Sequence, residues 1–345
     1  MKRSLASLVA LCLLVATPAA ARRYTAARDG DVIVLGDAAT ATTVSIMPSV
    51  GNIAFDMQVK GHRVLKYTQG SPGAFKASPN TTGIPFMGPW INRLDEQAFY
   101  ANGRRYPFDM ELGNVRGTIP IHGFLTTTDQ WRVTAMTANG GAAALTSRLE
   151  FYRQPAWMKQ WPFAHTIDMT YRLKDGVLEV ITTITNMSAD SMPVSIGYHP
   201  HFQLTDAPRD EWTIAVGART RWTLAPNKLP TGTTEPIERF FPNPMQAPLR
   251  NYDLDDVFSD LVRDSEGRAR MAVTGRTQQI EVLFGPRYKA AVLWAPKPQN
   301  FICFEPMAAI TNGINLAHKG IYKELTMLAP GEVWQESFWI RPRNF

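Results

Sequence analysis

Short runs of apolar and β-branched residues, separated by turn residues, recur along almost the whole chain. Several runs alternate in character with a period of two, which is typical of strands that lie between two layers. In the run 177–185, Leu178, Val180, Thr182 and Ile184 share one face. Because no stretch sustains a 3.6-residue period with caps at its ends, the pattern predicts short strands nearly everywhere.

Recognisable turns join some of these strands. Asn102-Gly103 stands between aromatic flanks in the stretch 97–108, and Lys174-Asp175-Gly176 joins two runs. Both central residues of a type I′ turn need positive φ, which favours Asn and Gly. The stretch 70–83 is rich in Gly, Pro, Ser and Asn and predicts a surface loop. The other predicted strands lie at residues 31–35, 42–47, 53–59, 130–137, 142–152, 163–173, 279–284, 290–294, 301–305 and 333–340.

Many short strands with frequent turns predict an all-β fold, a large antiparallel β-sandwich. The 345 residues are 45% hydrophobic and 10% aromatic, which is enough for a large core. A charged fraction of 19% argues against intrinsic disorder. Since no fixed-period repeat or linker divides the chain, we expect residues 22–345 to form a single domain.

The first 21 residues predict a secretory signal peptide, which is set aside from the fold. Lys2 and Arg3 form a basic start, an apolar run spans 5–15, and Ala19–Ala21 offers a cleavage site. We expect cleavage after Ala21 and a soluble protein exported to the periplasm or the extracellular space. Cys12 is removed with this segment and lacks the small preceding residue of a lipoprotein site. Only Cys303 then remains, so an intramolecular disulfide is excluded.

The formal net charge of +6 is spread along the chain. No Lys/Arg cluster is interleaved with aromatic residues, so nucleic acid is not an expected partner. No later apolar run is long enough to span a membrane. The sequence also lacks a Gly-rich phosphate loop, a nucleophile elbow and a CxxC motif. The oligomeric state is left open.

The stretch SIGYHPHFQL, residues 195–204, places His199 and His201 on either side of Pro200. Proline interrupts strand pairing, so the histidines are expected at a strand end that borders an open cleft. Histidine transfers protons near neutral pH, although ordinary loop histidines would give the same sequence. A metal site is not predicted here, because no cysteine or carboxylate lies at a zinc-like spacing in the sequence.

Two other stretches offer candidate acid, base or binding groups. His122 precedes Gly123, which permits a close backbone approach to a ligand. Glu305 ends the apolar run 301–304 before Pro306, where a buried carboxylate is costly unless it is paired or functional. A structural ion pair would also explain Glu305. His165 lies inside a predicted strand and is interpreted as a structural histidine.

The remaining candidates are polar and aromatic residues that could contact a ligand. Asn92 and Arg93 close the stretch GPWINR and could grip vicinal hydroxyls, or else cap loop carbonyls. Asp255 and Asp256 form a pair of acids that a solvated turn would equally explain. Trp90 and Trp294 are possible stacking surfaces for a ring-shaped ligand.

Taken in order, these stretches resemble the aldose 1-epimerase (galactose mutarotase) family from about residue 84 to the C-terminus. The resemblance is carried by NRL before a hairpin, IHGF before Trp131, the turn-linked strands that lead into GYHPHF, and FEP followed by LAPGE. The family's Gly-Arg-x-x-Asn-Arg motif appears here as GPWINR, without the first arginine. His201 stands where the family often has an aromatic residue. Both departures bear on which sugar is preferred.

The resemblance implies a one-domain β-supersandwich that needs no cofactor and acts on a small sugar. It implies that Glu305 is the general base and His199 the general acid, with His122, Asn92, Arg93 and Asp255 binding hydroxyls. Exchange of anomers requires one proton taken from the C1 hydroxyl and one given to the ring oxygen, which a carboxylate and an imidazole can supply. We expect a protonated His199 and an ionised Glu305 when the sugar is bound.

Three alternatives remain. A glycoside hydrolase or lyase on the same sandwich would use Glu305 and Asp255 as its acid pair at a defined separation. A hexose-6-phosphate epimerase fits poorly with an exported chain. A non-catalytic carbohydrate-binding module would keep the cleft, but it would need neither His199 nor Glu305.

Overall fold

The computed structural model describes residues 23–79, 82–111 and 115–345. The predicted signal peptide therefore lies outside the described residues, and its cleavage stays a prediction. Antiparallel sheets with a few short helices make up the structure, which confirms the all-β prediction. None of the helices in the described parts is long and apolar enough to cross a membrane.

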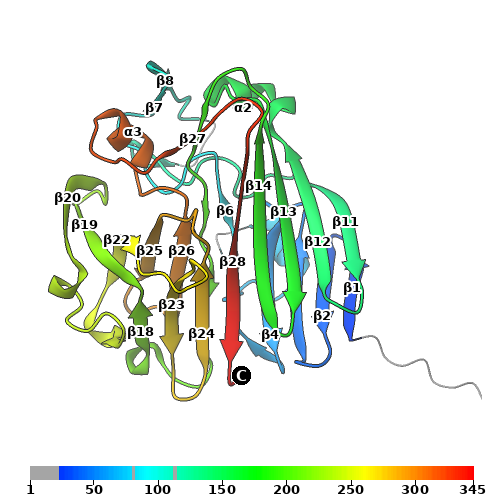
Figure 1. Ribbon diagram of the computed structural model, residues 1–345. Coiled ribbons are helices and arrows are strands. Elements are labelled where there is room, and N and C mark those ends of the chain that lie inside the picture. Colours follow the sequence, from blue (N-terminus) through cyan, green and yellow to red (C-terminus); the bar gives the residue numbers. More distant parts are fainter. Residues whose placement is uncertain (1–22, 80–81, 112–114) are drawn as a thin grey trace, which may run out of the picture.

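The largest layer is a nine-stranded sheet that runs across the front of Figure 1. Its spatial order is β11 (Arg132–Ala138), β12 (Ala143–Glu150), β13 (His165–Lys174), β14 (Val177–Asn186), β28 (Val333–Arg343), β24 (Gln279–Phe284), β23 (Ala269–Thr274), β18 (Thr213–Val216) and β21 (Ala247–Pro248). The C-terminal strand β28 thus lies near the middle of the sheet and joins its two halves.

Two further sheets pack on this layer. The five-stranded sheet covers the half with β11 to β13 and consists of β1 (Tyr24–Asp29), β2 (Val32–Asp37), β3 (Thr42–Met47), β4 (Ile53–Val59) and β5 (His62–Arg63). The eight-stranded sheet serves the other half and consists of β20 (Pro230–Pro236), β19 (Ala218–Leu224), β22 (Leu254–Leu261), β25 (Ala290–Ala295), β26 (Ile302–Met307), β16 (Gly197–Tyr198) and β6 (Phe86–Met87), with β17 (His201–Phe202) also pairing β26.

Smaller elements complete the described structure. Three two-stranded pairs are β7 (Ala98–Ala101) with β8 (Arg104–Pro107), β9 (Val115–Arg116) with β10 (Ile119–Pro120), and β15 (Met192–Val194) with β27 (Thr326–Leu328). The short helices are α1 (Pro72–Ala77), α2 (Pro155–Gln160) and α3 (Gly313–His318), together with four 3-10 turns, η1 (Phe151–Arg153), η2 (Arg209–Glu211), η3 (Ile237–Arg239) and η4 (Leu249–Asn251).

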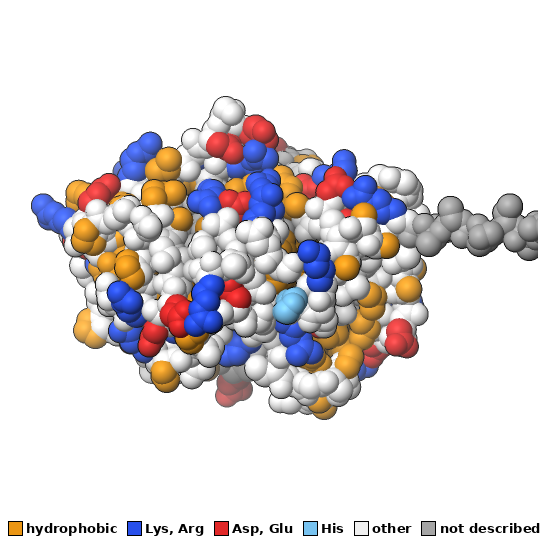
Figure 2. Space-filling model, turned by 90° about the horizontal axis from the view of Figure 1, so that it is seen from below, with side chains coloured by type: hydrophobic (Ala, Val, Ile, Leu, Met, Phe, Trp, Pro, Cys, Tyr) orange, Lys and Arg blue, Asp and Glu red, His pale blue; other side chains and the backbone are white. Residues whose placement is uncertain are grey.

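The alternation seen in the sequence places the core as expected. Leu178, Val180, Thr182 and Ile184 of β14 are all buried on one face. Both predicted type I′ turns are present: Asn102 and Gly103 have φ of 51° and 72°, and Asp175 and Gly176 have φ of 51° and 73°. On the face shown in Figure 2, basic and acidic side chains are interspersed rather than gathered by sign.

The stretch 70–83 is not wholly a loop, so that prediction is wrong in part. Helix α1 begins at Pro72, where the fixed φ of proline suits a first helical residue. The Ser71 side chain caps this helix by accepting a hydrogen bond from the Ala74 backbone N–H at 3.2 Å. A single buried side chain, Phe75, docks the helix on the core beside Phe55. Six residues are too few to show a helical period in the sequence.

Close backbone packing at Gly123 joins two segments that are distant in sequence. Gly88 and Gly123 form a parallel bridge, and Gly123 has φ of +61°. A Cβ atom on Gly123 would lie 2.0 Å from the Gly88 carbonyl oxygen. Only glycine fits at this position, and the backbone that approaches it belongs to the protein rather than to a ligand.

We expect Gly123→Ala to destabilise the fold by at least about 3 kcal/mol, since a steric clash is added to backbone strain. The matched control is Gly30→Ala, where φ is +57° and no heavy atom lies within 4 Å of the added Cβ. This control should lose only about 1 kcal/mol. Chemical denaturation of both variants measures the difference, and equal losses would show that the clash at Gly123 carries no cost.

Candidate active site

One face of the eight-stranded sheet carries a row of side chains that could take part in catalysis or bind a ligand. Asp255 of β22 pairs with Trp294 of β25, which pairs with Cys303 of β26, which pairs with His201 of β17. Directly paired residues point to the same face of a sheet, as do residues two apart along a strand. Glu305 therefore joins this face from β26, beside Cys303.

His199 reaches the same place from the short connection between β16 and β17. Its backbone N–H donates to the Pro85 carbonyl at 3.0 Å, and its ring stacks on His201 with centroids 4.7 Å apart. The preceding Tyr198 is fully buried; its hydroxyl lies 2.5 Å from the Thr182 hydroxyl, and its ring packs on Phe338. The nine-stranded sheet thus anchors the residue next to His199.

The opposite wall comes from the two segments that Gly88 and Gly123 join. Arg93 and Ile121 form a second bridge between these segments, and the His122 N–H donates to the Asn92 carbonyl at 2.8 Å. Asn92 and His122 both adopt positive φ, at 42° and 61°. Non-glycine residues in this conformation are uncommon and cluster at functional sites.

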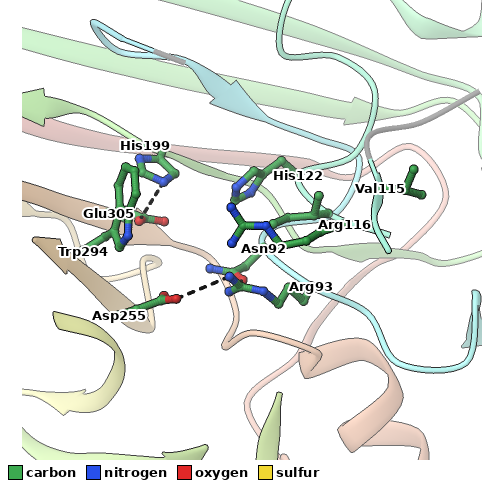
Figure 3. Close-up of a pocket in the computed structure, with 10 residues that line it drawn as sticks. Asn92, Arg93, Val115, Arg116, His122, His199, Asp255, Trp294 and Glu305 are labelled. Carbon is green, nitrogen blue, oxygen red and sulfur yellow. Dashed lines mark hydrogen bonds and ion pairs between the residues drawn. The ribbon is translucent and has the colours of Figure 1, made fainter. Parts of the chain in front are cut away.

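These two walls enclose a pocket of about 280 Å³, at the small end of the range for small-molecule sites. Figure 3 shows the predicted site residues converging on it. The pocket lining consists of Asn92, Arg93, Val115, Arg116, Ile121, His122, His199, Asp255, Trp294 and Glu305. Every candidate catalytic or hydroxyl-binding residue implied by the resemblance is therefore present in one cavity.

Sequence reasoning missed part of this lining and misplaced one aromatic residue. Val115 and Arg116 carried no signal, because the two-residue strand β9 shows no pattern. Ile121 belongs to the IHGF motif but was not named as a site residue. Trp294 is half-buried at the pocket, as a stacking surface requires. Trp90 is only 2% exposed and packs in the core against Phe108, so its interpretation as a sugar platform is wrong.

The two neighbouring acids Asp255 and Asp256 point to opposite faces of β22. Asp255 faces the pocket, where the Arg93 guanidinium donates to its carboxylate at 3.4 Å. A second nitrogen of Arg93 donates to the Asn92 side-chain oxygen at 2.9 Å, so these three residues form one chain of contacts. Asp256 points the other way and pairs with Arg221 at 2.7 Å, which gives it a structural role.

His199 and Glu305 meet at the base of the pocket. His199 Nε2 lies 3.2 Å from Glu305 Oε1, as the dashed line in Figure 3 marks. The contact is not aligned as a hydrogen bond, and both Glu305 oxygens lack a hydrogen-bond partner among the described residues. The Nδ1 atoms of His122, His199 and His201 are also unpartnered there. Buried polar atoms are normally satisfied, so this concentration indicates a site for a polar ligand.

Burial governs protonation in the pocket. It lowers the pKa of the His199 imidazole to about 4, and the nearby Arg93 charge acts in the same direction. It raises the pKa of the Glu305 carboxyl well above its usual range, assisted by the negative charge of Asp255 and opposed by Arg93. The free pocket thus favours a neutral imidazole beside a protonated carboxyl, the reverse of the charges expected for the sugar-bound state. Both arrangements hold one proton on the pair.

The sequence model of the aldose 1-epimerase family matches residues 32–341. The chain belongs to the aldose 1-epimerase family. The match extends well upstream of residue 84, where the sequence motifs that carried the resemblance begin. It covers all three large sheets except β1 and the last residues of β28.

Solved structures agree with the fold of this aldose 1-epimerase family member. A galactose mutarotase-like protein from Clostridium acetobutylicum has a TM-score of 0.81 at 20% identity, covering 93% of this chain and 98% of its own. A Synechocystis protein has a TM-score of 0.72 at 22% identity, covering 91% and 96%. The galactose 1-epimerase from Lactobacillus acidophilus has a TM-score of 0.71 at 14% identity, covering 93% and 98%. The predicted galactose mutarotase-like fold is therefore confirmed.

The low pKa values of buried histidines make the stability of this family member depend on pH. His165 lies in the core with its ring nitrogen 2.7 Å from the Phe163 carbonyl oxygen, which agrees with its interpretation as a structural histidine. Burial lowers the pKa of His165 to about 4, and it lowers the pKa values of His122 and His201 as well. Between pH 6.5 and 4 the unfolded chain therefore binds protons that the folded histidines exclude.

We expect the free energy of unfolding to fall as the pH falls through this window. Each shift from 6.5 to about 4 corresponds to about 3 kcal/mol at pH 4. The raised pKa of Glu305 has the opposite sign and offsets part of the loss. The free energy of unfolding is measured by urea denaturation at pH 7 and at pH 4. The difference between the two values should be smaller by about 3 kcal/mol in His165→Gln than in the wild type. The exposed histidine variant His62→Asn serves as the control, and an unchanged dependence in His165→Gln would refute this account.

Proposed function

We propose that the chain is an exported aldose 1-epimerase that interconverts the α and β anomers of a hexose. The observation that carries the proposal is the contact of His199 with Glu305 inside a sugar-sized pocket. Opposite them, Asn92, Arg93 and His122 present donors and acceptors that suit sugar hydroxyls, and Asp255 adds a carboxylate from the same wall as Glu305. Trp294 supplies an apolar surface for one face of the ring.

Ring opening moves two protons and forms no bond between sugar and protein. Glu305, as the general base, takes the proton of the C1 hydroxyl, while His199, as the general acid, gives its proton to the ring oxygen. The bond from C1 to the ring oxygen breaks, and C1 becomes an aldehyde. Rotation about the bond between C1 and C2 exchanges the faces, and the same transfers in reverse close the ring as the other anomer.

The protonation of the pair fits this cycle. When the ring is open, Glu305 holds the proton and His199 is neutral, which is the arrangement that burial favours in the free pocket. Binding of hydroxyl donors to the Glu305 oxygens stabilises the carboxylate and moves the proton to His199. Nε2 and Oε1 lie 3.2 Å apart, so a small rotation that aligns them would allow this transfer to be direct.

The glycoside hydrolase alternative is less well supported by the pocket. Asp255 is held by the Arg93 guanidinium at 3.4 Å, which stabilises a fixed carboxylate rather than a nucleophile or a proton donor. The binding-module alternative leaves the unpartnered oxygens of buried Glu305 without a purpose. Both alternatives are outcomes of the activity measurement below.

We expect the purified protein to accelerate the mutarotation of freshly dissolved α-D-glucose or α-D-galactose, followed by polarimetry. Glu305→Gln and His199→Asn should each reduce kcat by at least about 100-fold, since each removes one proton-transfer group. The controls Glu324→Gln and His62→Asn make the same chemical changes outside the pocket and should retain wild-type rates. Circular dichroism verifies that all four variants fold. Wild-type rates in either pocket variant would refute the assignment, and cleavage of a disaccharide would favour a hydrolase.

Export is tested separately by the N-terminus of the mature protein. Expressed from its full sequence in a Gram-negative host, the protein should appear in the periplasmic or extracellular fraction and begin at Arg22. Changing Ala19 and Ala21 to bulky charged residues should block processing, because the signal peptidase accepts small side chains at these positions. A full-length protein in the cytoplasmic fraction would contradict the proposal.

A further inference from the structure

Behind the catalytic contact lie two buried side chains that the proposed mechanism does not use. His201 is 3% exposed and Cys303 is fully buried, and both belong to the same cross-strand row. Together with His199, they place two ring nitrogens and a thiol within 4.8 Å of one another. No zinc-like spacing is visible in the sequence, because Cys303 lies on a strand more than 100 residues from His201.

We propose that His199, His201 and Cys303 form a binding site for a borderline-soft cation of the Zn²⁺ type. Two imidazoles and a thiolate are a donor set that selects Zn²⁺ over Mg²⁺ or Ca²⁺. Tetrahedral Zn²⁺ with bonds of about 2.0–2.3 Å needs donor atoms roughly 3.3–3.6 Å apart. From separations of at most 4.8 Å, the three side chains therefore need to close by at most about 1.2–1.5 Å, which side-chain rotations can supply.

A second observation points to a ligand at this place. The Nδ1 atoms of His199 and His201 have no hydrogen-bond partner among the described residues, although both rings are buried. A buried histidine normally satisfies both nitrogens or uses one to bind a metal. The rings stack with an interplanar angle of 12°, so both can turn toward the thiol from the same side.

The surroundings supply both access and electrostatic balance. His199 lines the pocket, so a cation entering from solvent meets this ligand first. Trp294 and Phe301 pack on His201 and form a dry wall behind the site. Glu305 adds a carboxyl on the same face of β26, which a bound cation would favour in its ionised form. The Lys66 ammonium, 4.0 Å from the Phe301 ring centroid, opposes a cation. Binding at the thiol releases its proton to solvent and leaves a sulfur–metal bond, so no redox partner is needed.

Occupation of this site would block the proposed reaction, because His199 cannot both ligate a cation and donate a proton to the ring oxygen. The inhibition rests on the proposed function, but binding of the cation does not. The site would make anomer exchange sensitive to zinc in the surrounding medium.

The binding test uses the tag-free, metal-stripped protein with a non-thiol reductant. Titration with Zn²⁺ against a chromogenic zinc indicator should reveal one tight site per chain. Cys303→Ala and His201→Phe should each weaken it by at least about tenfold, since each removes one ligand while preserving the packing volume approximately. His62→Asn, an exposed histidine outside the site, is the control and should bind like the wild type. If Cys303→Ala fails to fold, the zinc affinity of His201→Phe still tests whether the site exists.

The activity test separates the two proposals. Zinc should inhibit mutarotation by the wild type, a chelator should restore it, and Cys303→Ala should remain active at the zinc concentration that inhibits the wild type. Absence of mutarotation in metal-free protein would overturn the proposed function and leave the binding result standing. Absence of a stoichiometric zinc site, or wild-type affinity in both ligand variants, would overturn the metal site and leave the enzyme standing.

Discussion

The structure depends on keeping one proton between a carboxyl and an imidazole that are both shielded from water. A carboxylate or an imidazolium alone at the base of this pocket would carry a large desolvation cost. Burial therefore pushes the pKa of Glu305 up and that of His199 down, and the pair becomes neutral. Such a pair differs from a stabilising salt bridge, because burial keeps both partners neutral in the free pocket.

The surrounding fold serves mainly to hold that pair in place. Glu305 lies on a central strand of the eight-stranded sheet, where it pairs with Val292 of β25. Its neighbours Cys303 and Met307 pair with β17 and β16 on the other side of the strand. His199 sits in an irregular connection, and its neighbour Tyr198 is pinned to Thr182 and Phe338 of the large sheet. The remaining wall depends on the Gly88–Gly123 approach. Precision at the pair thus comes from three separate layers, which explains why a small site requires a fold of this size.

The sequence predicted the strands in which apolar and polar residues alternate clearly, but it predicted few of the other strands. Residues 205–278 contain β18 to β23, yet their charged and proline-containing strands were not singled out. Edge strands such as β20 are largely exposed on both faces, so they show no apolar stripe. The candidate catalytic and hydroxyl-binding residues were recognised because their motifs resemble those of the aldose 1-epimerase family. The juxtaposition of Cys303 with His201 was not, because strand pairing between segments distant in sequence sets it.

The same strand pairing explains why His199 can belong both to the contact with Glu305 and to the cluster with His201 and Cys303. Residues two apart on β17 and its preceding turn face residues two apart on β26, so His199 lies beside Glu305 while His201 lies beside Cys303. In the proposed mechanism the first pair exchanges protons only if the imidazole is free, whereas the thiol of the second pair favours a soft cation. An aromatic residue at position 201 would leave Cys303 with a single imidazole, too few donors to compete for zinc. Under both proposals, histidine at this position would add a metal-dependent control to the acid–base pair without changing the strands that hold it.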